Sequence, residues 1–95
     1  MALASIPSSA RPKISARARL QTDKITGKPI LLYPEGALML NPTAHAIVSL
    51  CTGQETIEQI TSSLATRYQS SASEISVQID TFLNRLRAKN LLELT

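Results

Sequence analysis

The sequence predicts an α+β domain in which a three-stranded antiparallel sheet is followed by three helices. Two observations lead to this prediction. Before residue 41, short apolar stretches alternate with turns that contain proline or glycine, which is typical of strands joined as hairpins. After residue 41, apolar residues recur three or four positions apart behind good N-cap residues, which is typical of amphipathic helices.

The sheet is expected to contain three strands. Apolar and polar side chains alternate roughly along residues 14–21, with two arginines on one side, so these residues form the first predicted strand. Pro29–Tyr33 forms the second, because proline is tolerated at the first position of a strand. Tyr33–Gly36 has proline second and glycine fourth, a pattern that type I turns favour. The third strand, Ala37–Leu40, then completes an antiparallel meander.

The third strand is expected to run into the first helix without a loop. Asn41 precedes Pro42, and a residue before proline is pushed out of the α region into extended backbone. Asn in that conformation is a preferred N-cap, and proline suits the first helical position. Gly53 is expected to adopt a left-handed conformation just past the helix end. The apolar face between them consists of Ala44, Ile47, Val48 and Cys51.

Two further helices are expected to begin at capping boxes, formed by Thr56 with Gln59 and by Ser71 with Glu74. Asn90 can take the left-handed position that ends the third helix, after which residues 91–94 can fold back onto the core. The apolar stripe of the second helix is Ile57, Ile60, Leu64 and Tyr68. The stripe of the third helix is Ile75, Ile79, Phe82, Leu83 and Leu86.

The 95 residues are expected to form one domain, residues 13–95, behind a mobile N-terminal arm of residues 1–12 that is rich in Ser, Ala and Pro. The single cysteine excludes an internal disulfide and a cysteine-based metal site. No apolar run is long enough to span a membrane, and the first residues do not resemble a signal peptide. We therefore expect a cytoplasmic protein without membrane contact.

Charge is distributed unevenly along the chain. Residues 1–34 carry six Lys or Arg against one acid, whereas residues 35–95 carry four basic and six acidic residues. The basic character therefore does not belong to the helices that would enter a DNA groove. The basic leading third is usually a solvated surface, but it could also steer an acidic partner.

The third strand is the best candidate for a binding site. At the edge of a meander it exposes unpaired backbone groups, and it contains no charge or proline that would protect this edge from another chain. A peptide could therefore add to it as a further strand beside the third helix. The simpler alternatives are that the edge is short, or that residues 91–94 cover it, and that Phe82 only packs in the core. The candidate peptide-binding residues are Ala37, Leu38, Met39, Leu40, Ile75, Gln78, Ile79, Phe82 and Arg85.

Catalysis is not expected. The sequence has no Ser/His/Asp set, no acid pair in a predicted pocket and no metal-ligand cluster, and His45 is the only histidine. Cys51 lies on the predicted buried face, where a free cysteine behaves as a small hydrophobic residue. Because three strands followed by three helices form a winged-helix-like outline, DNA binding is the alternative function, suggested by the fold alone.

Several segments resemble the PqqD family of pyrroloquinoline quinone (PQQ) biosynthesis. The resemblance covers about residues 12–94, and its most specific motifs are the Tyr-Pro-Glu-Gly turn, Leu-Asn-x-Thr-Ala and Leu-Cys-x-Gly. Thr52 departs from the family, which often has Asp before the glycine. The matching segments are Leu31–Gly36, Leu40–Ile47, Leu50–Gly53, Thr56–Ile60 and Leu64–Tyr68.

The resemblance implies a function as a RiPP recognition element, a module that holds a ribosomally made precursor peptide. It implies that the chain binds the precursor PqqA and presents it to the radical SAM enzyme PqqE, which cross-links a Glu and a Tyr of that peptide. The family takes the peptide as a strand beside the third strand and next to the third helix, without catalysis and without a cofactor. No nucleic acid partner is implied. The open sheet edge makes either a monomer or a weak homodimer expected.

Overall fold

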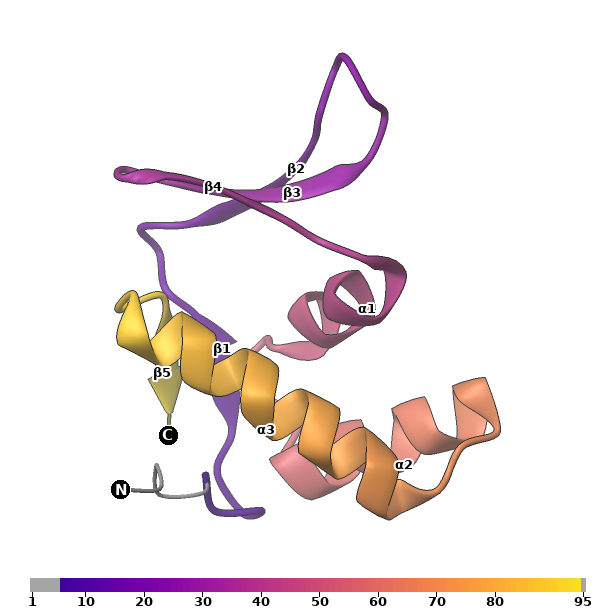
Figure 1. Cartoon of the computed structure of the whole chain (residues 1–95). Coiled ribbons are helices and arrows are strands. Elements are labelled where there is room, and N and C mark those ends of the chain that lie inside the picture. The colour runs from indigo at the N-terminus through magenta and orange to yellow at the C-terminus, as the bar shows by residue number, and fades with distance from the viewer. Residues whose placement is uncertain (1–5, 95) are drawn as a thin grey trace.

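The computed structural model describes residues 6–94 as a three-stranded sheet that lies over a layer of three helices (Figure 1). A small two-stranded sheet lies beside the C-terminal end of the third helix. The α+β prediction, with three helices after a three-stranded antiparallel sheet, is confirmed, while the winged-helix likeness stays a prediction. The elements are β1 (Pro12–Ile14), β2 (Arg19–Thr22), β3 (Pro29–Tyr33), β4 (Gly36–Met39), α1 (Pro42–Leu50), α2 (Ile57–Tyr68), α3 (Ala72–Ala88) and β5 (Leu92–Leu94).

The larger sheet has the order β2-β3-β4, with antiparallel pairing throughout, as the meander prediction required. Tyr33 pairs with Gly36, so the hairpin turns through only two residues. Leu31 lies opposite Leu38 and is fully buried, and Leu38 packs against the core. Because side chains alternate along a strand, this face of the sheet covers the helices and the other face is directed away from them.

The prediction of one strand over residues 14–21 was wrong. The segment is divided into β1 and β2 by a turn in which the Ala18 N–H donates to the Ser15 carbonyl at 3.0 Å. The Ser15 hydroxyl also accepts from the Arg17 N–H at 3.2 Å, a local bond that competes with a strand ladder. The rough alternation of the sequence therefore spans two strands that belong to different sheets.

β1 pairs with β5, which places Ile14 opposite Leu92. We predicted that residues 91–94 fold back onto the core, and the fully buried Leu91 confirms this. Their pairing as a strand was not predicted. The Ser15 N–H donates to the Leu91 carbonyl at 2.8 Å, so the start of the domain is joined to its end.

The junction between β4 and α1 has the predicted geometry. Asn41 is extended, with φ −74° and ψ 171°, and its Oδ1 accepts from the Ala44 N–H at 2.7 Å. Pro42 occupies the first turn, where its missing N–H has no consequence. Gly53 has φ +85°, and a side chain added there would approach that of Lys13 at 3.4 Å. Local residue chemistry therefore fixes both the end of β4 and the start of α1.

The caps of the other two helices also follow the sequence. Thr56 and Gln59 form both halves of the capping box of α2. At α3, Ser71 Oγ accepts from the Glu74 N–H at 3.2 Å, which is one half of the predicted box. Asn90 has φ +58°, as expected for the end of α3, whereas the left-handed Gln69 at the end of α2 was not predicted.

The hydrophobic core lies between α1, α2 and α3 and under the sheet. Leu31 contributes from the sheet, Ile47 from α1, Ile60 and Leu64 from α2, and Leu83 from α3, and each is at most 1% exposed. Burying such side chains contributes roughly 1.5–3 kcal/mol each. This shared core fixes the position of β4 relative to α3, on which the candidate site depends.

The N-terminal segment contacts the helices where it is described. Ile6 is 7% exposed, and its N–H donates to the Asp80 carboxylate at 3.2 Å. The carbonyls of Ser8 and Ala10 accept from the first two N–H groups of α2, which have no partner inside the helix. The rest of the predicted mobile arm, residues 1–5, lies outside the described residues. Among residues 6–94, no helix combines the length and apolar character that a membrane crossing needs.

Candidate functional site

β4 is an edge strand of the larger sheet. It pairs with β3 on one side, and on the other side no strand in residues 6–94 pairs with it. The alternative that residues 91–94 cover this edge is excluded, because β5 pairs with β1. Ala37 and Met39 are exposed, and Met39 keeps 54% of its surface. β4 therefore presents an uncharged and accessible edge, in contrast to the opposite edge strand β2, which begins with Arg19.

A groove of about 270 Å³ lies between α1 and α3, next to the end of β4. Three of the predicted site residues line it together: Gln78, Phe82 and Arg85. Asn41, which follows β4 and caps α1, lines the same groove, so the helix junction borders the site. The apolar part of its wall comes from Phe82 and from residues of both helices, namely Ala44, Ile47 and Val77.

The remaining predicted site residues lie elsewhere. Ala37, Leu38 and Met39 lie on the edge strand itself, with Leu38 half-buried against the core. Leu40, Ile75 and Ile79 are 4%, 3% and 0% exposed and belong to the hydrophobic core. Phe82 is 8% exposed yet lines the groove, so it belongs to both the core and the groove wall. The assignment of all nine residues to peptide binding stays a prediction.

A second hollow, of about 460 Å³, lies at the other end of β4. It is lined by Tyr33 and Glu35 from the β3–β4 hairpin, by Arg17, and by Ala88, Lys89 and Asn90 at the end of α3. The Lys89 Nζ lies 5.9 Å from the centre of the Tyr33 ring, a cation–π distance. No local pattern in the sequence connects Tyr33 with a lysine 56 positions later, so sequence reasoning missed this contact.

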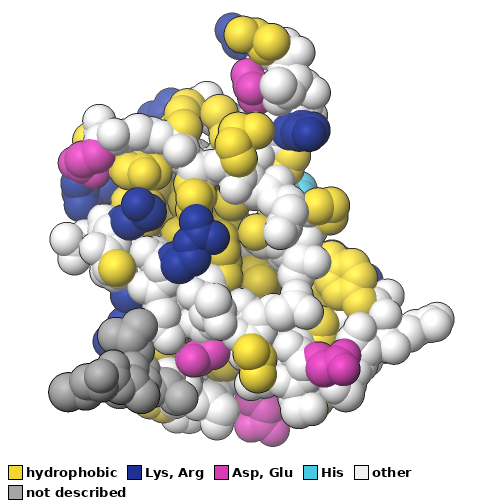
Figure 2. Space-filling view, viewed as in Figure 1, with side chains coloured by type: hydrophobic (Ala, Val, Ile, Leu, Met, Phe, Trp, Pro, Cys, Tyr) yellow, Lys and Arg dark blue, Asp and Glu magenta, His cyan; other side chains and the backbone are white. Residues whose placement is uncertain are grey.

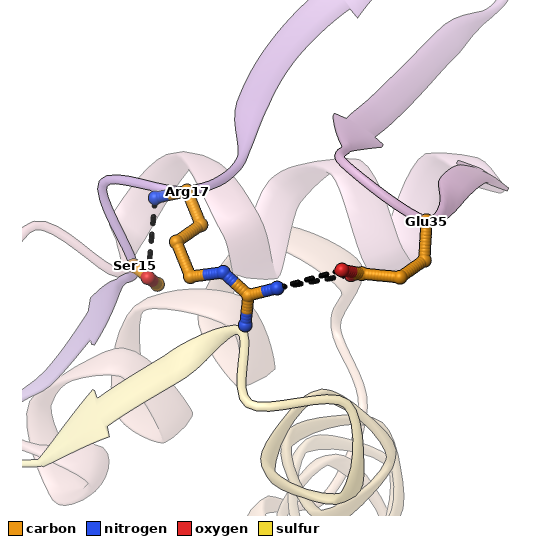
Figure 3. Close-up of polar contacts among 3 residues, drawn as sticks. All are labelled: Ser15, Arg17 and Glu35. Carbon is orange, nitrogen blue, oxygen red and sulfur yellow. Dashed lines mark hydrogen bonds and ion pairs between the residues drawn. The ribbon is translucent and has the colours of Figure 1, made fainter.

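Arg17 and Glu35 form an ion pair at this end of the site (Figure 3). The Arg17 Nη2 donates to both carboxylate oxygens of Glu35, at 2.8 and 3.1 Å. The pair connects the β1–β2 turn to the β3–β4 turn, but its side chains are 44% and 60% exposed. Such an exposed pair adds at most about 1 kcal/mol of stability. Its main consequence is that the Glu35 charge is already balanced within the chain.

Hydrophobic side chains gather in the hollow between the sheet and α3, and Lys and Arg side chains lie over it (Figure 2). Asp and Glu side chains also gather at the opposite end of the molecule, over α2 and the start of α3 (Figure 2). There a hollow of about 640 Å³ separates α2 from α3, and its charged lining residues are Glu58 and Asp80. The two regions therefore have opposite charge.

The structure places Cys51, the one candidate nucleophile, inside the core. Cys51 is 4% exposed, and burial raises the pKa of its thiol to about 12. The thiol is therefore protonated at neutral pH, whereas the thiolate is the reactive form. In residues 6–94 no group of three or more His, Cys, Asp and Glu side chains is arranged to hold a metal ion.

The comparisons with known proteins agree with one another. The sequence model of the family described as "Coenzyme PQQ synthesis protein D (PqqD)" matches residues 30–92. A PqqA binding protein from Methylococcus capsulatus is 36% identical over 66 residues, which cover 70% of this chain and 71% of the relative.

Two solved structures share the fold. The first is the solution structure of the PqqD truncation of Methylobacterium extorquens PqqCD, described as a functional and stand-alone RiPP recognition element. It is 32% identical, has a TM-score of 0.74, and is aligned over 86% of this chain and 87% of its own. The crystal structure of PqqD from Xanthomonas campestris is 28% identical, with a TM-score of 0.59 over 98% of both chains.

Proposed function

Because the chain belongs to the PqqD family, we propose that it binds the precursor peptide PqqA and presents it to the radical SAM enzyme PqqE without catalysing a reaction itself. The observation that carries this proposal is the open β4 edge beside the groove of Gln78, Phe82 and Arg85. The proposed partners are a peptide and an enzyme, with no nucleic acid, no membrane and no cofactor. The chain acts as a monomer or as a weak homodimer through the same edge, in the cytoplasm.

Strand addition to β4 explains how such a site binds a peptide. The added strand satisfies backbone groups of β4 by main-chain hydrogen bonds, and pockets for alternate side chains provide selectivity. The groove next to Asn41 is the pocket available for an apolar side chain. Because the helix cap and the core hold β4 in place, its backbone has little conformational freedom to lose on binding.

Alternation along the added strand explains how the peptide is presented. Peptide side chains on the same face of the sheet as Leu38 point toward α3 and are held in the groove. The intervening side chains point the other way, beside Ala37 and Met39, on the face of the sheet that is directed away from the helices. An enzyme that approaches this outer face reaches peptide side chains without displacing the peptide from its carrier.

The proposed role is non-catalytic, and the buried, protonated thiol of Cys51 supports it by making a cysteine nucleophile unavailable. The test combines binding with product analysis. The full chain should bind synthetic PqqA in isothermal titration calorimetry, and the mass of the peptide should remain unchanged after incubation with this protein alone. Adding PqqE and its cofactors should produce cross-linked peptide faster with this protein than without it. A changed peptide mass before PqqE is added, or the absence of binding, would overturn the proposal.

A further inference from the structure

Arg85 and Lys89 are positive charges that form no ion pair with a carboxylate of residues 6–94. Both lie one turn apart at the C-terminal end of α3, and in residues 6–94 the one ion pair found is between Arg17 and Glu35. Arg85 lines the groove next to Asn41, and Lys89 lines the hollow next to Tyr33. The two cations therefore border the space along β4 that the proposed function assigns to the peptide.

α3 runs antiparallel to β4. Its residues 78–85 share a groove with Asn41, which follows the C-terminal end of β4. Its end, at Lys89, shares a hollow with Tyr33 and Glu35, which precede β4. A peptide paired antiparallel to β4, as the other strands of this sheet are paired, would therefore run in the same direction as α3. It would pass first the apolar groove, then Arg85 and then Lys89.

The spacing of the two cations matches an extended peptide. Four residues along a helix advance about 6 Å, so this distance separates Arg85 from Lys89 along α3. Side chains two positions apart on one face of a strand are about 7 Å apart. One peptide residue would face Arg85. The peptide residue two positions before it would face the apolar part of the groove, near Gln78 and Phe82.

We propose that the groove selects a peptide segment with an apolar residue followed, two and four positions later, by Asp or Glu. The apolar side chain fills the groove beside Phe82, and the two carboxylates pair with Arg85 and Lys89. This inference rests on the proposed function and specifies which peptide sequence the site takes and in which direction. The Glu35 carboxylate does not compete with the peptide for Lys89, because Glu35 already pairs with Arg17.

The rest of the surface supports this choice of site. The larger hollow between α2 and α3 contains Glu58 and Asp80 and no Lys or Arg. An acidic segment would be repelled there and attracted to Arg85 and Lys89 at the end of α3. Charge therefore favours the space along β4 over the hollow between α2 and α3, and it favours one orientation of the peptide along β4.

The test is a charge swap measured by fluorescence anisotropy with labelled synthetic PqqA. Each acidic residue of the peptide is changed in turn to its amide. We expect the amide substitution to weaken binding by about threefold to fivefold at each of two peptide positions that are separated by one residue. This loss of affinity corresponds to the free energy of an exposed ion pair. The double variant Arg85→Glu/Lys89→Glu should bind the native peptide at least about tenfold more weakly, and its affinity should depend less on salt.

The decisive arm is rescue. A peptide with Lys at those two positions should bind the double variant more tightly than it binds the native protein. Arg87→Glu is the matched control, because Arg87 lies on the same turn but contacts Asn84 at 3.4 Å and lines neither hollow. Circular dichroism melting confirms that the variants fold. Native peptide binding that is unaffected by both sets of changes would overturn the inference and leave the proposed function intact. Failure of the native protein to bind any PqqA would overturn both.

Discussion

Removal of the N-cap at Asn41 gives the sharpest test of how the site is held. Asn41→Ala deletes the Oδ1 that accepts from the Ala44 N–H at 2.7 Å. The helix has only nine residues, and its first turn contains no acidic side chain that could also stabilise this end. The released N–H belongs to Ala44, which is 8% exposed, and the loss of the cap should cost about 1 kcal/mol, the typical value for a lost N-cap. For a domain of this size, that corresponds to a fall in Tm of about 4–8 °C.

The assay is urea denaturation followed by circular dichroism at constant m-value, with Asn41→Asp as the control. Asp retains an acceptor oxygen and adds a negative charge at the helix N-terminus, so its midpoint should stay close to that of the native protein. The denaturation midpoint alone tests the cap, because Asn41 also lines the groove that is proposed to hold the peptide. Coincident midpoints for Asn41→Ala and the native protein would refute the assignment of the cap.

Two further predictions concern the edge strand and the thiol. Met39→Pro removes one N–H from the edge strand and should weaken PqqA binding by about tenfold or more. Met39→Ala keeps the N–H and should weaken binding far less. Equal losses of affinity for the two variants would contradict strand addition. Cys51, with its pKa raised to about 12, should resist iodoacetamide at pH 8 in the native state and react rapidly in urea. Rapid alkylation of the native protein would show that the thiol is accessible. Cys51→Ser should still bind PqqA.

The sequence predicts this fold best where short-range chemistry decides the structure. Asn41 followed by Pro42, the Thr56 capping box and the Tyr33–Gly36 turn each depend on residues at most three positions apart, and the structure contains all three. Helical spacing likewise predicts that Phe82 and Leu83 are buried, because the apolar stripe must face the other helices.

The sequence fails where distant residues decide the structure. β1 and β5 are three residues each and pair across almost the whole chain, so neither has a periodicity that predicts it. The candidate site has the same limit. The spacing along one helix brings together Gln78, Phe82 and Arg85, whereas the approach of Lys89 to Tyr33 depends on how α3 crosses the sheet.

Strand addition to β4 is the central claim, and NMR of the isotope-labelled full chain with unlabelled PqqA tests it most directly. The account predicts cross-strand NOEs between peptide protons and the backbone of residues 37–39, with amide shift changes concentrated at residues 37–40 and 75–89. It also predicts slower amide exchange along β4, because edge N–H groups gain partners. Shift changes confined to residues 6–20 or 57–67, with the amides of β4 unchanged at saturation, would contradict it.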